Sequence, residues 1–359
     1  MLSALAGLSQ AGKIPLKHNP MSIQDYRSQK AVLESRAQSW ALGESVPVKD
    51  YMNTQYFIEV ELGSNNQKFT LVPDTGSSNL WVYSSSCYNV ACLRHQRFNS
   101  KKSTTYEKDG EDFVIEYGSG GVSGIVGKDI ATIGDISAPM SFGEISKVDG
   151  PTFLVSQMDG IIGLAYDTIS VDKLPTFMDE AQVSEKSFAF YLKDKSEESY
   201  MTLPGIDEEA AVTKVATHDV IEKSYWNVNL TSASGAQGAV DTTGYKAAID
   251  SGTSLIVGPN TIIAPLIEGI PVEDQGVIDC AILDTLPDIS FTFDETVYTL
   301  TPNDYVLKET VLKQTQCILG VMGADLPAEF NYVIVGDVFM RKYPTLFSLD
   351  DNTVTFYSQ

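Results

Sequence analysis

Short runs in which apolar and polar side chains alternate recur along most of the chain. In Tyr56–Leu62 every second residue from the first onward is apolar, and two of the three residues between them are glutamates. A period of two residues is typical of a β-strand with one buried and one exposed face. Enrichment in β-branched and aromatic residues predicts further strands at Phe113–Ile133, Tyr200–Leu203, Trp226–Leu230, Ile289–Leu300 and Val354–Tyr357. The pattern therefore predicts a mainly β protein.

Helical patterns are few and mostly short. We predict helices near Leu174–Val183 and at Thr261–Ile267, the second with Asn260 as its N-terminal cap. A longer stretch, Ser22–Ala41, has few strand formers and begins with a serine whose hydroxyl can cap a helix. Because it precedes the strand-rich region, we expect a separate N-terminal helix.

The chain contains an internal duplication. Leu71–Val82 reads LVPDTGSSNLWV and Ala247–Gly258 reads AAIDSGTSLIVG, so each is an apolar strand, an Asp-Thr/Ser-Gly turn and a second apolar strand. An apolar-apolar-Gly motif follows each one after nearly the same number of residues, ending at Gly163 in the first half and at Gly336 in the second. This period is far longer than the 20–50 residues of stacked repeats, so it indicates two duplicated domains rather than a solenoid.

Composition narrows the possible partners. The 359 residues carry 47 acidic against 25 basic side chains, a net charge of -22. The protein's own field therefore repels polyanions, and we expect no nucleic-acid partner. Self-repulsion falls as carboxylates gain protons, which favours an acidic working pH. We expect no membrane span, because no run of about 18 uncharged apolar residues occurs.

Several features favour a secretory route. Leu2–Leu8 is followed by small residues, as at the end of a signal peptide. A disordered N-terminus is an alternative interpretation of the same residues. The four cysteines fall as two pairs, each within one half of the chain and without metal-ligand spacing. We expect disulfides Cys87–Cys92 and Cys280–Cys317 in an oxidising compartment. Asn229 begins an Asn-Leu-Thr sequon and is a candidate glycosylation site.

Motifs of other enzyme classes are missing. The histidines His18, His95 and His218 stand in no HExxH motif, and no nucleophile elbow accompanies them. We therefore interpret each histidine as a surface residue. The glycine-rich stretch Gly118–Gly127 lacks the glycine spacing of a phosphate-binding loop. Metal-dependent, serine-nucleophile and nucleotide-dependent chemistry are thereby disfavoured.

The duplicated motifs closely resemble those of the pepsin-like aspartic proteases, and within that family they resemble the cathepsin D-like group. The chain as a whole resembles the zymogen form of such a protease. The resemblance covers the chain from Tyr51 onward. It rests on Asp74-Thr75-Gly76-Ser77, Asp250-Ser251-Gly252-Thr253, Ile161-Ile162-Gly163, Ile334-Val335-Gly336 and Tyr117-Gly118-Ser119-Gly120. It implies an all-β, bilobal pepsin-like fold of two duplicated β-barrel-like domains with the active-site cleft between them. We assign residues 1–48 to a signal remnant and propeptide, 49–218 to the N-terminal lobe and 219–359 to the C-terminal lobe.

The resemblance implies an endopeptidase that uses Asp74 and Asp250 as a catalytic dyad at acidic pH, without a cofactor or a metal. Two carboxylates held close together share one proton, so the pair can activate a water that lies between them. The small hydroxyl residues Thr75 and Ser251 suit a buried turn, and Gly76 lets the turns approach each other. Further family positions that support the dyad are Ser77 and Trp81, the latter resembling the tryptophan that hydrogen-bonds the flap tyrosine.

Substrate-binding positions are implied in the same way. Tyr117, Gly118 and Ser119 resemble the flap that closes over the substrate, and Gly252 and Thr253 resemble groups that bond the substrate backbone. Phe153 and Ile161, with Leu154 and Met158, resemble the wall of the pocket beside the scissile bond, although core residues would give the same letters. The implied partners are peptide and protein substrates with bulky apolar residues around the scissile bond, pepstatin-like inhibitors and the chain's own propeptide.

The N-terminal residues resemble an inhibitory propeptide. Residues 1–48 hold five basic and three acidic side chains on a strongly acidic chain, so we expect electrostatic attraction to the cleft that fades as carboxylates are protonated. Lys13–Leu16 resembles the first pro-strand, and Lys30 is our choice for the residue nearest the dyad. The implied location is the secretory pathway, leading to an acidic lysosome-like or vacuolar compartment or to secretion.

Three departures from the family pattern stand out. Pro73 precedes the first aspartate and lacks an N–H for a ladder bond. A third disulfide and the Lys-Tyr pair that usually blocks the dyad are both absent. Two other readings stay open from sequence: a catalytically silent relative that only binds peptides, and a glycosidase with two carboxylates.

Overall fold

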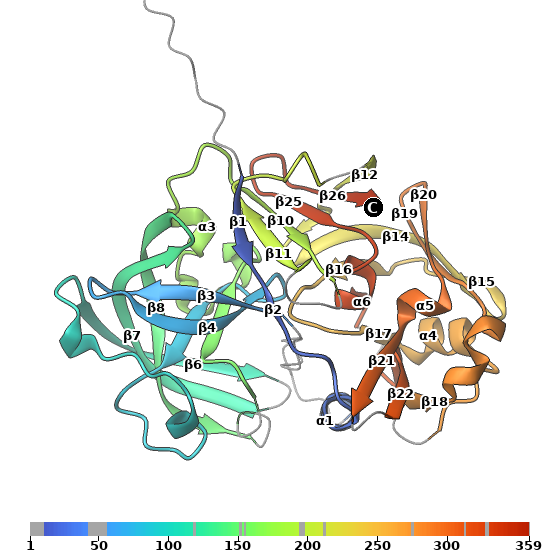
Figure 1. Cartoon of the computed structure of the whole chain (residues 1–359), viewed down its shortest axis with the longest axis horizontal. Coiled ribbons are helices and arrows are strands. Elements are labelled where there is room, and N and C mark those ends of the chain that lie inside the picture. The colour runs from blue at the N-terminus through green and yellow to red at the C-terminus, as the bar shows by residue number, and fades with distance from the viewer. Residues whose placement is uncertain are drawn as a thin grey trace, which may run out of the picture.

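Four β-sheets and a few short helices make up the regular structure of the described residues (Figure 1). The structure, a computed structural model, describes residues 11–41, 56–117, 120–150, 153, 156–193, 198–210, 213–273, 276–311, 314–326 and 330–358. The predicted all-β class is therefore confirmed. No helix in these ranges is long and apolar enough to cross a bilayer.

An eight-stranded sheet forms the N-terminal lobe, on the left in Figure 1. Its strands, in spatial order, are β2 (Lys17–His18), β3 (Tyr56–Leu62), β4 (Gln67–Asp74), β9 (Gly160–Gly163), β5 (Leu80–Tyr83), β8 (Ile136–Asp149), β7 (Gly120–Ile133) and β6 (Glu107–Tyr117). The alternation seen in the sequence matches β3, in which Glu59 is exposed while Ile58 and Val60 are fully buried. The predicted strand region at 113–133 is a hairpin of β6 and β7.

The C-terminal lobe, on the right in Figure 1, contains a nine-stranded and a three-stranded sheet. The larger one runs β20 (Thr296–Leu300), β19 (Ile289–Phe293), β14 (Trp226–Gly235), β16 (Lys246–Ile249), β24 (Tyr332–Val335), β17 (Ile256–Pro259) and β23 (Val321–Ala324), with β13 (Glu222–Lys223) and β15 (Gly238–Val240) paired to β14. The smaller one consists of β18 (Val277–Ile278), β22 (Gln314–Leu319) and β21 (Val306–Val311).

A six-stranded sheet joins the lobes and takes strands from distant parts of the chain. It runs β1 (Gly12–Pro15), β11 (Tyr200–Leu203), β10 (Ser187–Tyr191), β25 (Thr345–Ser348), β26 (Thr353–Ser358) and β12 (Thr213–Asp219). The boundary that we predict at residues 218 and 219 falls inside β12, and the boundary at 48 and 49 lies outside the described residues. The division into lobes at those residues stays a prediction.

The helices differ in detail from the sequence-based expectations. They are α1 (Ile23–Ala41), α3 (Phe177–Glu180), α4 (Asn260–Ile267), α5 (Pro302–Tyr305) and α6 (Asp337–Met340). The helix predicted at 174–183 shrinks to the single turn of α3, where Thr176 and Asp179 form a capping box. Asn260 is not the cap of α4 as predicted: Pro259 takes the cap position, and the Asn260 amide donates to Asp325 at 2.8 Å.

The duplication in the sequence corresponds to a repeated topology. In the N-terminal lobe β4 pairs parallel with β9, which pairs antiparallel with β5; in the C-terminal lobe β16, β24 and β17 repeat this arrangement. The glycine that ends each apolar-apolar-Gly motif permits the crossing. A Cβ on Gly163 would lie 2.4 Å from the Ser78 backbone, and one on Gly336 would lie 2.0 Å from the Thr253 carbonyl oxygen. Any side chain there would displace the loop that follows the aspartate.

The N-terminal segment is docked by strand pairing and by apolar side chains. Strand β1 extends the joining sheet through β11, β2 pairs with β3, and α1 packs against β23. The Ser22 cap is confirmed as a capping box, in which the Ser22 hydroxyl accepts from the Asp25 N–H and the Asp25 carboxylate accepts from the Ser22 N–H. The buried side chains of the segment include Ile14, Leu16, Met21, Tyr26 and Leu33.

Both expected disulfides, Cys87–Cys92 and Cys280–Cys317, are present. The surface positions expected for two histidines are wrong. The side chain of His95 is buried, stacks on Tyr83 and lies 3.4 Å from Asp159. His218 is only 2% exposed. Histidine carries no helical or strand periodicity of its own, so its burial follows from the polar partners that the tertiary fold places beside it.

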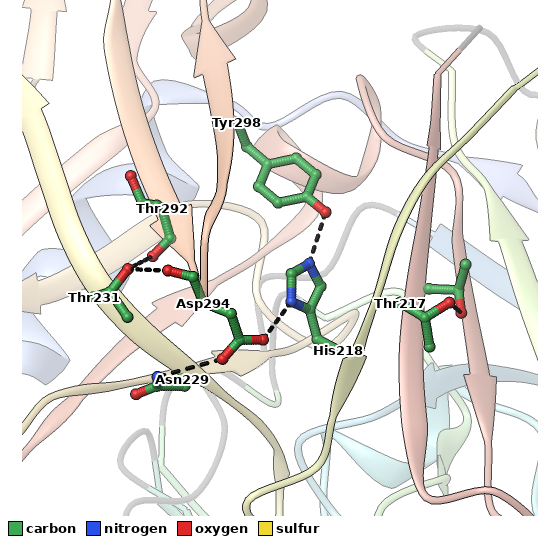
Figure 2. A network of polar contacts seen from close by, with 8 residues as sticks. Thr217, His218, Asn229, Thr231, Thr292, Asp294 and Tyr298 are labelled. Carbon is green, nitrogen blue, oxygen red and sulfur yellow. Dashed lines mark hydrogen bonds and ion pairs between the residues drawn. The ribbon is translucent and has the colours of Figure 1, made fainter.

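His218 connects the joining sheet to the C-terminal lobe (Figure 2). From β12 its Nδ1 lies 2.8 Å from Asp294 Oδ2, and its Nε2 lies 2.8 Å from the hydroxyl of Tyr298 on β20. Asp294, at the turn between β19 and β20, also accepts from the sequon residue Asn229 at 3.3 Å. Because the imidazole is buried among aromatic rings, both of its nitrogens depend on these two partners.

We predict that His218→Ala lowers the free energy of unfolding by about 2–4 kcal/mol, because it leaves a cavity and removes a partner from Tyr298 and Asp294. Urea unfolding at neutral pH measures this change. Lys214→Ala, at an exposed position of the same strand, is the control and should change stability by less than about 0.5 kcal/mol. Equal effects of the two substitutions would show that the His218 contacts are energetically unimportant.

Candidate active site

The two Asp-Thr/Ser-Gly turns meet at the centre of the molecule. Asp74 ends β4 and Asp250 directly follows β16, so each turn stands at the end of the first strand of its repeated unit. Both side chains are buried, with Asp74 0% and Asp250 6% exposed. Residues that are far apart in sequence thus form a single site.

Reciprocal hydrogen bonds join the turns. The Thr75 hydroxyl donates to the Ile249 carbonyl at 2.9 Å and accepts from the Ser251 N–H at 2.8 Å. In the mirrored arrangement, the Ser251 hydroxyl donates to the Pro73 carbonyl at 2.7 Å and accepts from the Thr75 N–H at 3.1 Å. Four bonds therefore satisfy two buried hydroxyls and four backbone groups at once, which fixes the spacing of the two turns.

The carboxylates are oriented from within their own turns. The Gly76 N–H donates to Asp74 Oδ1 at 2.7 Å, and the Gly252 N–H donates to Asp250 Oδ1 at 2.8 Å. A hydroxyl holds the second oxygen of each: Ser77 donates to Asp74 Oδ2, and Thr253 donates to Asp250 Oδ2 at 2.7 Å. The two carboxylates thus have equivalent surroundings, as the sequence duplication predicts.

Gly76 also keeps the partner carboxylate close. A Cβ on Gly76 would lie only 2.6 Å from Asp250 Oδ1, so any larger residue would push Asp250 away from the first turn. Asp250 adjoins a small cavity of about 20 Å³, whose lining includes Tyr225 and Tyr332. That volume is enough for one water molecule. The sequence analysis missed the two tyrosines, because no motif links them to the aspartate turns.

Burial raises the pKa of Asp250 well above its ordinary value, and the nearby charge of Asp74 raises it further. Hydrogen bonds from Thr253 and Gly252 favour the ionised form, but they do not outweigh these two effects. Two close carboxyl groups release their protons in steps that belong to the pair. The site can therefore hold one proton between two carboxylates.

The structure locates some of the expected flap and pocket residues. Tyr117 ends β6 and pairs with Gly120 of β7, whereas Gly118, Ser119 and Leu154 lie outside the described residues. Trp81 is fully buried, and its ring centroid lies 6.4 Å from that of Phe153. Ile161 and Met158 belong to the same apolar cluster of the N-terminal lobe. The bond expected between Trp81 and the flap tyrosine involves a side chain outside the described part.

Pro73 does not interrupt the site. It lies within β4 opposite Ile162 of β9, and the parallel ladder continues to Asp74 and Gly163. Its missing N–H costs no bond between the turns, because it is the Pro73 carbonyl that accepts from Ser251. The departure from the family pattern at Pro73 therefore leaves the pairing of β4 with β9 intact.

Lys30 differs from its neighbour in the N-terminal helix. Its side chain is exposed and bonds to no described residue, whereas Gln29 is 1% exposed. The Gln29 amide has no hydrogen-bond partner among the described residues. Lys30 is chosen by its charge, and charge cannot point to a neutral residue such as Gln29. No sequence motif indicates that this glutamine is buried.

No three His, Cys, Asp or Glu side chains group as metal ligands within the described ranges. The sequon residue Asn229 is half-buried on β14, and Thr231 is exposed on the same strand.

Comparison with known proteins identifies the class of the molecule. The model of the eukaryotic aspartyl protease family matches residues 55–359. The chain belongs to this family and is an aspartic endopeptidase.

Individual relatives cover most of the chain. Cathepsin D from Chionodraco hamatus is 40% identical over 350 residues, which are 93% of this chain and 88% of that protein. Vacuolar protease A from Neurospora crassa is 38% identical over 319 residues, 86% of this chain and 80% of that protein. Human cathepsin D is 38% identical over 336 residues, 86% of this chain and 82% of that protein. The resemblance seen in the sequence motifs is thereby confirmed.

The raised pKa of Asp250 predicts a stability that depends on pH. The contribution of its proton is fully present below the ordinary value of 3.8 and is lost as pH rises through the higher value of the folded chain. Relative to Asp250→Asn, the wild-type chain should therefore lose about 1–3 kcal/mol of unfolding free energy between acidic and neutral pH. Unfolding curves at several pH values measure this difference, with the mass of the chain checked after each.

Asp135→Asn, at an exposed position, provides the matched control and should follow the wild-type pH dependence. A constant difference between wild type and Asp250→Asn at every pH would contradict a proton held at this site. The comparison between variants removes the contribution of carboxylates far from the site, because they are common to each chain. The difference that remains belongs to the coupled pair of Asp74 and Asp250.

Proposed function

We propose that Asp74 and Asp250 form the catalytic dyad of this endopeptidase. The observation that carries the proposal is the set of reciprocal bonds that hold two buried carboxylates in equivalent turns. The ionised member of the pair accepts a proton from a water between the carboxyl groups, and the water oxygen attacks the scissile carbonyl carbon. The protonated member donates to the carbonyl oxygen. The carbon–nitrogen bond of the tetrahedral intermediate then breaks as a proton passes from the dyad to the leaving amine. Because water is the nucleophile, no covalent bond forms between the enzyme and the substrate.

The supporting roles follow from the contacts of each turn. Thr75 and Ser251 set the distance between the turns, Gly76 and Gly252 orient one oxygen of each carboxylate, and Ser77 bonds the other oxygen of Asp74. Gly252 and Thr253, with the flap residues Tyr117, Gly118 and Ser119, bind the backbone of an extended peptide. Pepstatin-like inhibitors occupy the same cleft.

Phe153 and Ile161 line the pocket for the side chain before the scissile bond. Both residues are buried in one apolar cluster with Trp81 and Met158, and the assignment to the pocket rests on the resemblance to the family. Apolar pockets discriminate between similar side chains by only about 1–3 kcal/mol, so the enzyme has a broad preference for bulky apolar residues.

The N-terminal segment is an inhibitory propeptide, held by burial more than by charge. Its one ion pair to the catalytic body among the described residues joins Lys13 to Asp207 at 2.5 Å. Burial raises the pKa of Asp207, but hydrogen bonds from Lys13 and Tyr200 outweigh it and leave the pKa below its ordinary value. This pair therefore persists in mild acid, and release of the segment requires separation of its apolar contacts as well. Lys30 remains a candidate for contact with the cleft.

The proposed location is the secretory pathway, leading to an acidic lysosome-like or vacuolar compartment, with secretion as the alternative. The relatives named vacuolar protease A and the two disulfides support it. Asn229 is the proposed glycosylation site.

We predict that Asp74→Asn and Asp250→Asn each lower peptide hydrolysis by at least about a thousandfold, because each breaks the unit that shares the proton. Cleavage of denatured haemoglobin by the acid-activated chain, with and without pepstatin, is the measurement. Asp135→Asn should retain wild-type activity. Activity within about threefold of wild type in either dyad variant would refute the assignment.

We predict that Tyr26→Ala weakens inhibition by the N-terminal segment. The Tyr26 ring is buried against Gly276, where an added Cβ would lie 2.2 Å from the ring. Loss of a buried aromatic side chain costs about 3–5 kcal/mol, so removal of the segment on acidification should accelerate by at least about tenfold. Mass and activity are followed together after a shift from neutral to acidic pH.

Lys13→Gln is the control, because a partly exposed ion pair is worth only about 0–1 kcal/mol. It should activate at nearly the wild-type rate. If Tyr26→Ala also activates at that rate while retaining wild-type circular dichroism, apolar docking of α1 does not hold the segment in place.

A further inference from the structure

A cavity of about 420 Å³ shares no lining residue with the cavity beside Asp250. Four parts of the chain form it: the turn between β2 and α1, the residues after β10, the segment from α5 into β21, and the end of α6. Its volume falls within the range of about 300–1,000 Å³ that is usual for small-molecule sites. Neither the aspartate turns nor the flap accounts for it.

The charge of this cavity opposes that of the whole protein. Its lining includes Lys193, Lys308, Arg341 and Lys342, with His18 on the wall formed by the N-terminal segment. Among the described residues that line it, Asp304 is the only acidic one. On a chain with 47 acidic and 25 basic residues, random placement would give the opposite balance. Such local clustering of cations attracts an anion even when the net charge repels one.

The single acid is already neutralised. Asp304 Oδ2 lies 2.6 Å from Lys342 Nζ and accepts from the N–H and the hydroxyl of Thr301, both at 2.7 Å. Lys308 donates to the neutral amide oxygen of Asn303 at 3.1 Å. Lys193 forms no ion pair with another described residue. The positive charges of Lys193 and Lys308 are therefore not compensated within the described part of the cavity.

The rest of the lining is apolar. Leu192 and Val338 are at most 1% exposed, and Met21, Val306 and Leu307 are also buried. Cationic side chains and these apolar side chains, which we call the floor, line one cavity, and this combination fits a ligand with a charged group and a compact apolar body. Amines on flexible stems bind phosphate and sulfate groups as point charges, without the planar geometry that a carboxylate–arginine pair requires.

We propose that this cavity is a binding site for a small organic phosphate or sulfate ester. The oxyanion lies between Lys193 and Lys308, and the apolar body of the ester covers the floor. Because the walls come from the N-terminal segment and from the C-terminal lobe, one bound ligand contacts both. Binding therefore favours the state in which the segment is docked, by the ordinary linkage between a ligand and the conformation that binds it.

The test measures binding to the uncleaved chain at neutral pH by isothermal titration calorimetry. The probes are phenyl phosphate, phenyl sulfate and, as the uncharged analogue, phenol. Lys193→Gln/Lys308→Gln removes both uncompensated charges and keeps the stems. Lys101→Gln/Lys102→Gln is the matched control, because it removes two lysines from the exposed helical turn Ser100–Lys102 of the N-terminal lobe and changes the net charge equally.

We expect at least one ester to bind the wild type and the control equally, and to bind Lys193→Gln/Lys308→Gln at least about tenfold more weakly. The tighter of the two esters identifies the phosphate or the sulfate as the preferred group. The proposal is overturned if neither ester binds, if phenol binds as tightly as the esters, or if both double variants bind alike. None of these readouts depends on peptidase activity, so they are independent of the catalytic proposal.

Discussion

Two buried hydroxyls, on Thr75 and Ser251, hold the halves of this protein together at the turns that carry Asp74 and Asp250. Each one donates to the backbone of the opposite strand and accepts from the opposite turn. A buried polar group without a partner costs about 1–3 kcal/mol, so loss of either hydroxyl would leave several groups unsatisfied. The reciprocal arrangement therefore specifies one relative position of the lobes, and with it the approach of Asp74 to Asp250.

This fixed position has an electrostatic consequence. The carboxylates have little solvent around them and face each other, so the ionised state of Asp250 is disfavoured. The hydrogen bonds from Gly252 and Thr253 compensate part of that cost without removing it. The short separation that lets two carboxyl groups share a proton also makes the folded chain more stable at acidic pH than at neutral pH. The acidic composition points in the same direction, because self-repulsion is smaller at low pH.

The N-terminal segment is an integral part of the fold, because its strands β1 and β2 each form an edge of a β-sheet. Strand β1 supplies one edge of the joining sheet, and Tyr26 fits against Gly276, whose positive φ of 76° favours glycine. The segment also closes the cationic cavity through His18 and Met21. Charge complementarity, which the sequence suggested as the main force, is represented in the described residues by the pair of Lys13 and Asp207. Buried apolar side chains, among them Ile14, Leu16, Tyr26 and Leu33, also contribute to docking.

The sequence by itself determined the all-β class, the two disulfides, the helix that follows Ser22 and the pairing of Asp74 with Asp250. Each depends on local composition and periodicity, on the separation of the cysteines into two pairs, or on a motif that occurs twice. It could not determine what depends on contacts between distant segments. The burial of His218, the shortened helix α3, the exposure of Lys30 and the cavity around Lys193 and Lys308 all arise where separate elements meet. The environment of a side chain at such places is set by the partners that the tertiary fold supplies. The pattern of hydrophobic and polar residues along the sequence does not specify these partners.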